Sequence, residues 1–303
     1  MTWAATLLEF LLDRVSPSKL QPGAIERICG IASASLRAVD EAVLRVGNEL
    51  PLMKPRRCTK MVGQLARLAV LSGLAETAIA GPPYVSDDPQ PTDTRHYEIY
   101  LFAGGTEGRD GTSGATGVDF NYGAAPNLQL TAVIPIAYDK PSDERSASGL
   151  GNIELAAKYR FLHQADLGWD VAFFPRVTLP SASAQVGDTH TLLLLPLWLQ
   201  RDAGRWSTFG GGGCVINRGG DSRDYCLAGW ALTRQVIPNL QLGAEIVHQT
   251  PDSRDGRAST GVGAGMLYDV NKNYHLLAYA GPGLQNAAVT GRYSWYASIL
   301  LTF

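Results

Sequence analysis

Ionisable side chains stand at alternate positions in several segments of the sequence. In residues 152–161, Glu154, Lys158 and Arg160 alternate with Ile, Leu, Ala, Tyr and Phe residues. Because alternate side chains of an extended strand lie on one face, these acids and bases would share a single surface, where they could pair with one another or bind a polar ligand. The same pattern elsewhere adds further members to this surface, which we predict to hold His96, Glu98, Asp119, Glu154, Lys158, Arg160, Asp170, Arg176 and Glu245.

The elements that must position these residues are β-strands. From Arg95 onwards, alternating segments of about ten residues recur, which is the length of a tilted membrane-spanning strand. In the last segment, residues 293–303, the odd positions are apolar or aromatic and Ser294 and Thr302 are among the even ones. We predict twelve strands, at residues 95–104, 114–123, 128–138, 150–161, 168–178, 189–199, 206–215, 225–235, 240–249, 258–268, 274–281 and 293–303.

The lengths of the connectors distinguish a membrane barrel from a soluble β-sandwich, which the alternation alone does not. Tight connectors at residues 124–127 and 236–239 alternate with longer polar ones. With an even strand count, this predicts an all-β fold, a closed antiparallel transmembrane β-barrel with both chain ends on the periplasmic side. The last strand ends on the aromatic residue Phe303, and we expect the barrel-assembly machinery to contact the chain through that strand. The longer connectors are residues 139–149, 180–188, 217–224, 251–257 and 282–292.

A secretory signal peptide is predicted to begin at Met53. Basic residues follow Met53, a short apolar stretch comes next, and an Ala-Ile-Ala sequence ends at Ala80, so we expect cleavage between Ala80 and Gly81. Since a signal peptide belongs at a start codon, the helix-compatible residues before Met53 are expected to be missing from the mature protein. The predicted parts are an upstream extension at 1–52, the signal peptide at 53–80, a periplasmic lead at 81–94 and the barrel at 95–303.

Composition and charge exclude several classes of protein. The apolar content of 45% excludes a disordered chain, and no apolar run reaches the roughly 18 residues that a membrane-spanning helix needs. Residues 81–303 contain 21 acidic and 16 basic residues, a net charge of −5. Without a basic excess to neutralise phosphates, we expect no nucleic-acid partner.

Two cysteines, Cys214 and Cys226, remain after the predicted cleavage. They flank a polar loop at the ends of two predicted neighbouring strands, and in an oxidising compartment we expect them to form a disulfide. Two thiols without a neighbouring His do not make a metal site, so we predict no metal. The four glycines at 210–213 lack the Lys-Ser or Lys-Thr of a phosphate-binding loop, and no cofactor is expected.

Several short motifs give the sequence a family resemblance. The motifs are Pro-Asn-Leu-Gln-Leu at 126–130, Ile-Pro-Ile at 134–136, Gly-Leu-Gly-Asn-Ile-Glu-Leu at 149–155, Lys-Tyr-Arg-Phe at 158–161, the segment 228–252, and Ser-Trp-Tyr at 294–296. In them the sequence resembles a family of outer-membrane transporters associated with the meta-pathway of phenol degradation. The resemblance extends over essentially the whole predicted mature chain. It implies an outer-membrane channel for small aromatic or hydrophobic compounds.

We therefore predict a channel for passive uptake of small molecules, surrounded by outer-membrane lipid and not an enzyme. Two alternatives stay open. One is an outer-membrane hydrolase acting on lipid, in which His248 would pair with a serine of a neighbouring strand, and the other is a structural barrel whose loops bind a partner. The nine ionisable residues would be either a network of pairs that fills a narrow lumen or a constriction that selects cargo. Their mixed charges predict weak ion selectivity.

Overall fold

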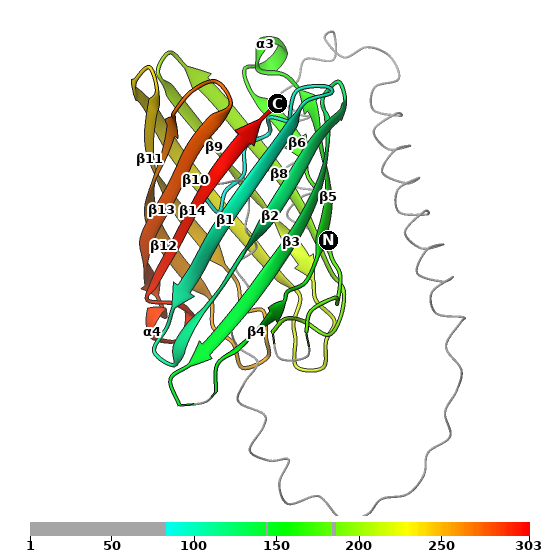
Figure 1. Ribbon diagram of the computed structural model, residues 1–303, viewed down its shortest axis with the longest axis vertical. Helices are drawn as coiled ribbons and strands as arrows, with labels where there is room; N and C mark the ends of the chain where they lie inside the picture. The colour runs from blue at the N-terminus through cyan, green and yellow to red at the C-terminus, as the bar shows by residue number, and fades with distance from the viewer. Residues whose placement is uncertain (1–82, 144, 184–185) are drawn as a thin grey trace, which may run out of the picture. The chain divides into compact units, whose positions relative to one another are not determined.

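The computed structural model describes residues 83–143, 145–183 and 186–303, so the predicted upstream extension, signal peptide and cleavage site lie outside the described residues. One antiparallel sheet closes on itself, because the first strand, β1 (Tyr97–Glu107), pairs along its length with the last, β14 (Tyr293–Thr302). Figure 1 shows the resulting barrel with its strands tilted. No helix among the described residues is long and apolar enough to cross a membrane.

The described sheet has fourteen strand segments that occupy twelve positions around the barrel. β4 and β5 both pair with β3, and β6 and β7 both lie between β5 and β8, so each of these two pairs is one interrupted barrel strand. The prediction of a closed antiparallel barrel of about twelve strands is therefore confirmed. The other strands are β2 (Gly111–Ala125), β3 (Leu128–Pro141), β4 (Ala147–Leu150), β5 (Glu154–Leu162), β6 (Asp170–Phe173), β7 (Arg176–Thr178), β8 (Leu192–Ala203), β9 (Trp206–Ile216), β10 (Tyr225–Ile237), β11 (Leu240–Gln249), β12 (Ser259–Asp269) and β13 (Tyr274–Gln285).

Apolar side chains cover the outside of the barrel and polar side chains are buried inside it. In β10, Leu232 is 48% exposed on the outer face, whereas the next residue, Thr233, is fully buried. The same contrast separates exposed Ile246 from buried Glu245 in β11. Because soluble proteins bury their apolar side chains, this inverted pattern is typical of a barrel in lipid.

The inner surface of the barrel carries two clusters of buried apolar residues. The first, which we call the apolar wall, lies along neighbouring strands from the β6–β7 junction to β10. The second is mostly aromatic and includes Tyr84, which precedes the barrel in the sequence. The apolar wall consists of Phe174, Leu194, Trp198, Val215, Tyr225 and Leu227, and the second cluster of Tyr84, Phe102, Phe209, Ala231, Tyr279 and Tyr296.

The two ends of the barrel differ in their connectors. At the end where the chain terminates, short turns join the strands, with positive φ angles at Asn127 and Gly204, and a one-turn helix, α3 (Gln164–Leu167), links β5 to β6. The longer loops lie at the other end, together with β4 and the one-turn helix α4 (Ala287–Thr290) (Figure 1). Mutual hydrogen bonds between the backbones of Tyr97 and Phe303, at 2.9 and 3.0 Å, complete the closure of the barrel.

The first strand begins later than the sequence pattern predicts. Arg95 has a φ of 67°, which no extended strand contains, and β1 starts only at Tyr97. His96 therefore precedes the strand instead of forming part of it. This residue is exposed, and its Nδ1 atom lies 3.2 Å from the carbonyl oxygen of Thr94.

Candidate functional site

Residues 83–94, which we call the luminal segment, lie inside the barrel. Tyr84, Ser86, Asp87 and Thr92 of this segment are all buried, with at most 5% of their surface exposed. The sequence predicts a periplasmic lead at 81–94 before the barrel, and the described part of that lead packs against the inner wall. The barrel interior supplies partners for the carboxylate of Asp87, for the ring of Tyr84 and for backbone N–H groups of the luminal segment.

The first contact is with the β10–β12 side of the barrel. Glu245 of β11, 4% exposed, accepts hydrogen bonds from the backbone N–H groups of Val85 and Ser86, at 3.1 and 2.5 Å. Tyr84 fits where β12 has a glycine, since a Cβ atom at Gly265 would lie only 2.7 Å from its ring. This side of the barrel therefore has space for the segment and an acceptor for its backbone.

The second contact is a buried ion triad on the other side of the lumen. Asp87 accepts from Lys158 Nζ of β5 through Oδ1, at 2.8 Å, and from Arg176 Nη2 of β7 through Oδ2, at 2.6 Å. The side chains of Asp87, Lys158 and Arg176 are only 2%, 6% and 4% exposed. Four barrel strands separate β5 from β11 on one side and six on the other. Adjacent residues of the segment, Ser86 and Asp87, thus bind nearly opposite walls of the barrel.

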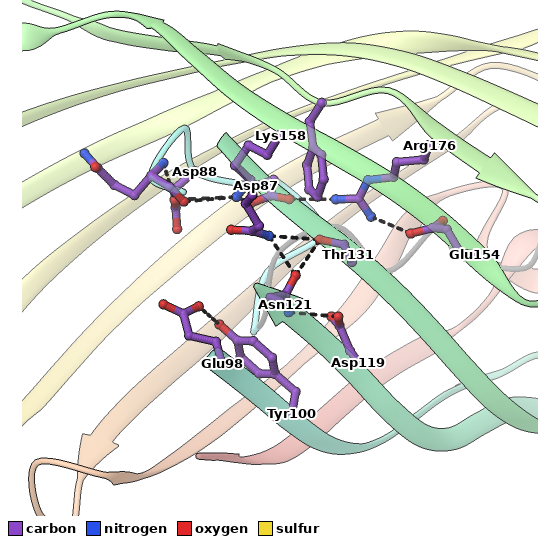
Figure 2. Close-up of a pocket in the computed structure, with 13 residues that line it drawn as sticks. Asp87, Asp88, Glu98, Tyr100, Asp119, Asn121, Thr131, Glu154, Lys158 and Arg176 are labelled. Atoms are coloured by element: carbon purple, nitrogen blue, oxygen red, sulfur yellow. Dashed lines mark hydrogen bonds and ion pairs between the residues drawn. The ribbon is translucent and has the colours of Figure 1, made fainter. Parts of the chain in front are cut away.

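The cations of this triad have further neighbours. Arg176 Nη1 lies 3.4 Å from Glu154 Oε1, and Lys158 Nζ lies 3.9 Å from Asp88 Oδ1 (Figure 2). Both cations also lie against the ring of Phe174, with Arg176 Cζ at 4.2 Å and Lys158 Nζ at 4.8 Å from its centroid. Phe174 belongs to the apolar wall, so the triad lies where the charged and apolar parts of the lumen meet.

A third contact fastens the end of the luminal segment that leads into β1. Gln129 of β3 accepts from the backbone N–H of Thr92 at 2.8 Å, and its own amide donates to Asn121 of β2 at 2.7 Å. Thr131 donates to the same Asn121 oxygen at 2.5 Å. Because Asn121 and Thr131 hold the Gln129 side chain in place, the bond from Thr92 fixes the position of the segment where it leads into β1.

A small polar cavity remains beside the segment. It has a volume of about 50 Å³, which leaves room for a few water molecules but not for an organic molecule. Acidic residues outnumber basic ones around it, and Figure 2 shows them converging from the segment and from β1, β2, β5 and β7. Its charged lining residues are Asp87, Asp88, Glu98, Asp119, Glu154, Lys158 and Arg176.

Most of the ionisable residues expected to share one surface do face the lumen. Glu98, Asp119, Glu154, Lys158 and Arg176 line the cavity. The other four lie apart from it. Arg160 and Asp170 form a separate ion pair at 3.6 Å, with Gln90 hydrogen bonded to both, while Glu245 lies on the opposite wall and His96 is exposed outside the lumen.

Asp87 is the central residue that the strand pattern missed. It precedes the first strand, so no alternation marks it, and only its contacts with Lys158 and Arg176 reveal its importance. One signal was present in the sequence. Glycines at inward positions of β10, β11 and β12, namely Gly229, Gly243 and Gly265, leave space inside the barrel that Ser86 and Tyr84 fill.

The predicted disulfide is present between Cys214 and Cys226. The two residues are direct partners in the register of β9 and β10, with their Cα atoms 3.9 Å apart. Their neighbours Val215 and Tyr225 are buried in the lumen, so the disulfide lies on the outer face of the barrel. It closes the loop between these strands without touching the luminal segment.

Two groups of side chains bear on the hydrolase alternative. His248 Nδ1 lies 2.8 Å from Thr260 Oγ1, but this hydroxyl donates to Gln285 Oε1 at 2.8 Å. In the lumen, His275 lies between Asp269, at 2.6 Å, and Thr302, at 3.2 Å.

The Thr302 hydroxyl in turn donates to the carbonyl oxygen of Lys272 at 3.1 Å. A nucleophilic hydroxyl must give its proton to the histidine. In both groups the hydroxyl proton has another acceptor, so neither group is arranged as a nucleophile and base.

The chain is similar to several solved structures at low sequence identity. The outer-membrane channel from Pseudomonas putida F1 has a TM-score of 0.57 and 14% sequence identity, over 71% of this chain and 97% of that one. The NanC porin has a TM-score of 0.49 and 11% identity, over 67% and 98% of the two chains. The β domain of the Bordetella autotransporter BrkA has a TM-score of 0.46 and 12% identity, over 69% and 99%.

The likeness to the Pseudomonas channel shows the fold of a bacterial outer-membrane barrel, as predicted from the strands and connectors. No curated protein matches the sequence. A family model described as "Putative MetA-pathway of phenol degradation" matches residues 86–294, which include part of the luminal segment as well as the barrel. The chain belongs to this family, which the motifs in its sequence had indicated.

Proposed function

We propose that the protein is an outer-membrane channel for passive diffusion of small molecules, closed in this conformation by its luminal segment. The observation that carries the proposal is the segment itself. A lumen that serves only as a structural core is filled by side chains of its own walls, whereas this one is crossed by a separate stretch of chain. Side-chain contacts at opposite walls, through Glu245 on one and Lys158 and Arg176 on the other, hold that stretch in place.

The lining of the lumen supports a cargo that is partly apolar. The apolar wall gives one side of the lumen aromatic and aliphatic surface, while acids and bases lie on the other. Ligand sites of this kind combine apolar contact area with a few polar groups that fix orientation. Together with the family to which the chain belongs, this favours small aromatic or hydrophobic compounds as cargo.

The placement of the protein in the membrane follows the same proposal. The exposed apolar residues of the outer face would contact outer-membrane lipid. β14 remains our predicted contact for the barrel-assembly machinery, since it ends beside Phe303 at the junction that closes the barrel. Cleavage between Ala80 and Gly81 also stays a prediction, which N-terminal sequencing of the exported protein tests.

The test is ion current through the purified protein in planar bilayers, with the luminal segment locked or free. A Cβ atom at Gly229 would touch Ser86 Oγ, so the double variant Ser86→Cys/Gly229→Cys should form a disulfide between segment and wall. We expect low current from the oxidised variant and higher current after reduction. Wild-type protein given the same reductant is the control, because its native disulfide lies on the outer face.

The outcomes separate the channel from its alternatives. Absence of current from both the wild type and the reduced variant would overturn the proposal. Equal current before and after reduction would show that the segment does not close the channel. An ester-hydrolysis assay on the same preparation tests the hydrolase. Cleavage without ion current would favour the enzyme, and neither signal would favour a structural barrel.

A further inference from the structure

Lys158 and Arg176 hold the Asp87 carboxylate as they would hold a bound ligand. Each cation donates to a different oxygen of the carboxylate, at 2.8 and 2.6 Å, and each is more than nine-tenths buried. Charge-assisted bonds of this geometry are the usual means by which proteins recognise free carboxylates. The two cations come from the barrel wall, whereas the carboxylate comes from the luminal segment.

The surroundings of the two cations suit an organic molecule better than an inorganic anion. The ring of Phe174 lies beneath both, and Leu194 and Trp198 continue the apolar wall beyond it. A ligand with a carboxylate at one end and an apolar body at the other could bind the cations and this wall together. No such match exists for a small inorganic ion, which has no apolar surface to bury.

The acids near the cations restrict the charge of such a ligand. Glu154 lies 3.4 Å from Arg176 and Asp88 lies 3.9 Å from Lys158, and Glu98 and Asp119 also line the cavity. A second negative charge on the ligand would face these carboxylates at close range in a partly desolvated lumen. The arrangement therefore favours a monocarboxylate over a dicarboxylate or a phosphate.

We propose that Lys158 and Arg176, above Phe174, form a subsite for the carboxylate of a small organic acid, and that Asp87 occupies it until such a molecule takes its place. The inference rests on the proposed channel function and names a class of cargo for it. Removing Asp87 without a replacement would take from two buried cations the carboxylate that each holds at the shortest distance, which is costly. An entering carboxylate avoids that cost and frees the luminal segment in the same step.

Exchange between Asp87 and a free carboxylate is a competition between an attached and a diffusing ligand. A tethered group has an effective concentration in the millimolar range when its linker is short and flexible, and the contacts of the segment with Glu245 and Gln129 raise that of Asp87 further. Displacement of Asp87 therefore requires cargo at millimolar concentration or above, and the subsite need not bind it tightly. Weak binding suits a channel, because cargo must also leave.

The test compares benzoate with benzamide, its neutral analogue of nearly the same shape, on wild-type protein and the Asp87→Asn and Asp87→Asn/Lys158→Gln variants. Liposome swelling measures permeation of each probe, and bilayer current measures the open channel. In Asp87→Asn we expect benzoate to be preferred over benzamide by about tenfold or more, the equivalent of one charge-assisted hydrogen bond. In the double variant, which removes one of the two cations and keeps Arg176, the preference should fall towards one.

A measurement on wild-type protein keeps the inference testable if the variants do not fold. Benzoate should increase hydrogen exchange at the backbone amides of the luminal segment, and benzamide at the same concentration should not. Equal permeation of benzoate and benzamide through a conducting Asp87→Asn channel would overturn the inference, as would unchanged exchange with benzoate. If neither the wild type nor a folded variant conducts ions, the channel function itself fails, which is a separate result.

Discussion

Replacing Glu245 by glutamine should release the luminal segment from the β11 wall. The carboxylate of Glu245 accepts two backbone N–H groups, from Val85 at 3.1 Å and from Ser86 at 2.5 Å, in an environment where it is 4% exposed. A glutamine of the same length offers one oxygen to these two donors. Its NH₂ group would face the second N–H, so one buried donor would lose its acceptor.

The size of the effect follows from these contacts. A hydrogen bond to a charged group contributes about 1.5–3 kcal/mol, and a neutral one about 0.5–1.5 kcal/mol. Exchanging two charged bonds for one neutral bond should weaken docking of the segment by about 2.5–4.5 kcal/mol. Since about 1.4 kcal/mol corresponds to a factor of ten, the undocked population should rise roughly 60- to 1,600-fold.

Hydrogen exchange measures this population directly, because amides of the segment exchange when it leaves the wall. We expect faster exchange of residues 83–94 in Glu245→Gln, with the strands of the barrel still protected, and a larger ion current. Glu107→Gln, which changes an exposed glutamate at the end of β1, is the matched control and should alter neither. Unchanged exchange of the segment in a folded Glu245→Gln barrel would refute the idea that Glu245 anchors it.

Three further predictions concern other parts of the barrel. Gly265→Leu should expel the Tyr84 ring, which lies 2.7 Å from the position of a Cβ at residue 265, and raise the ion current in planar bilayers. Replacing Cys214 and Cys226 by alanine should loosen the β9–β10 loop by roughly 3 kcal/mol in the chain-entropy model, seen as faster proteolysis with unchanged current. Burial raises the pKa of the Asp188 carboxyl in the β7–β8 loop, so its ionisation opposes the folded loop above that pKa. Wild-type protein should therefore be cut faster than Asp188→Asn in this loop at neutral pH, and the two rates should converge once the pH falls below the ordinary aspartate pKa of about 3.9.

The barrel could be predicted from the sequence because the direction of the side chains along a strand repeats every two residues. Alternation between lipid-facing and lumen-facing side chains is visible without any knowledge of pairing, and tight turns at Asn127 and Gly204 end the strands on one side. The two interruptions were not predicted. Residues 151–153 separate β4 from β5, and residues 174–175 separate β6 from β7, whereas the sequence pattern predicts one continuous strand across each gap. Hydrogen bonds from Gly151 N–H to Pro135 and from Ala157 N–H to Pro175 keep the wall connected there.

Of the residues that form the candidate site, only those that lie on strands could be predicted from the sequence. Alternation identifies Lys158 and Arg176 as inward-facing, since it fixes the face of a strand on which each side chain lies. It says nothing about which acid pairs with them, because pairing depends on how a non-strand segment folds back into the lumen. Residues 83–94 are rich in proline and lack any periodic pattern, so only their contacts in the folded barrel define their position.

Lys158 explains why this lumen holds a segment of chain at all. Arg160 has a partner on the wall in Asp170, and Arg176 has one in Glu154, at 3.6 and 3.4 Å. The carboxylates that pair with Lys158, those of Asp87 and Asp88, both belong to the luminal segment. A buried lysine is costly without an anion nearby, so in an open lumen a carboxylate from the solution would join Glu98 of the wall, which lines the same cavity, in balancing its charge. The residue that holds the segment in the closed barrel is therefore the one that would hold a carboxylate cargo in the open barrel.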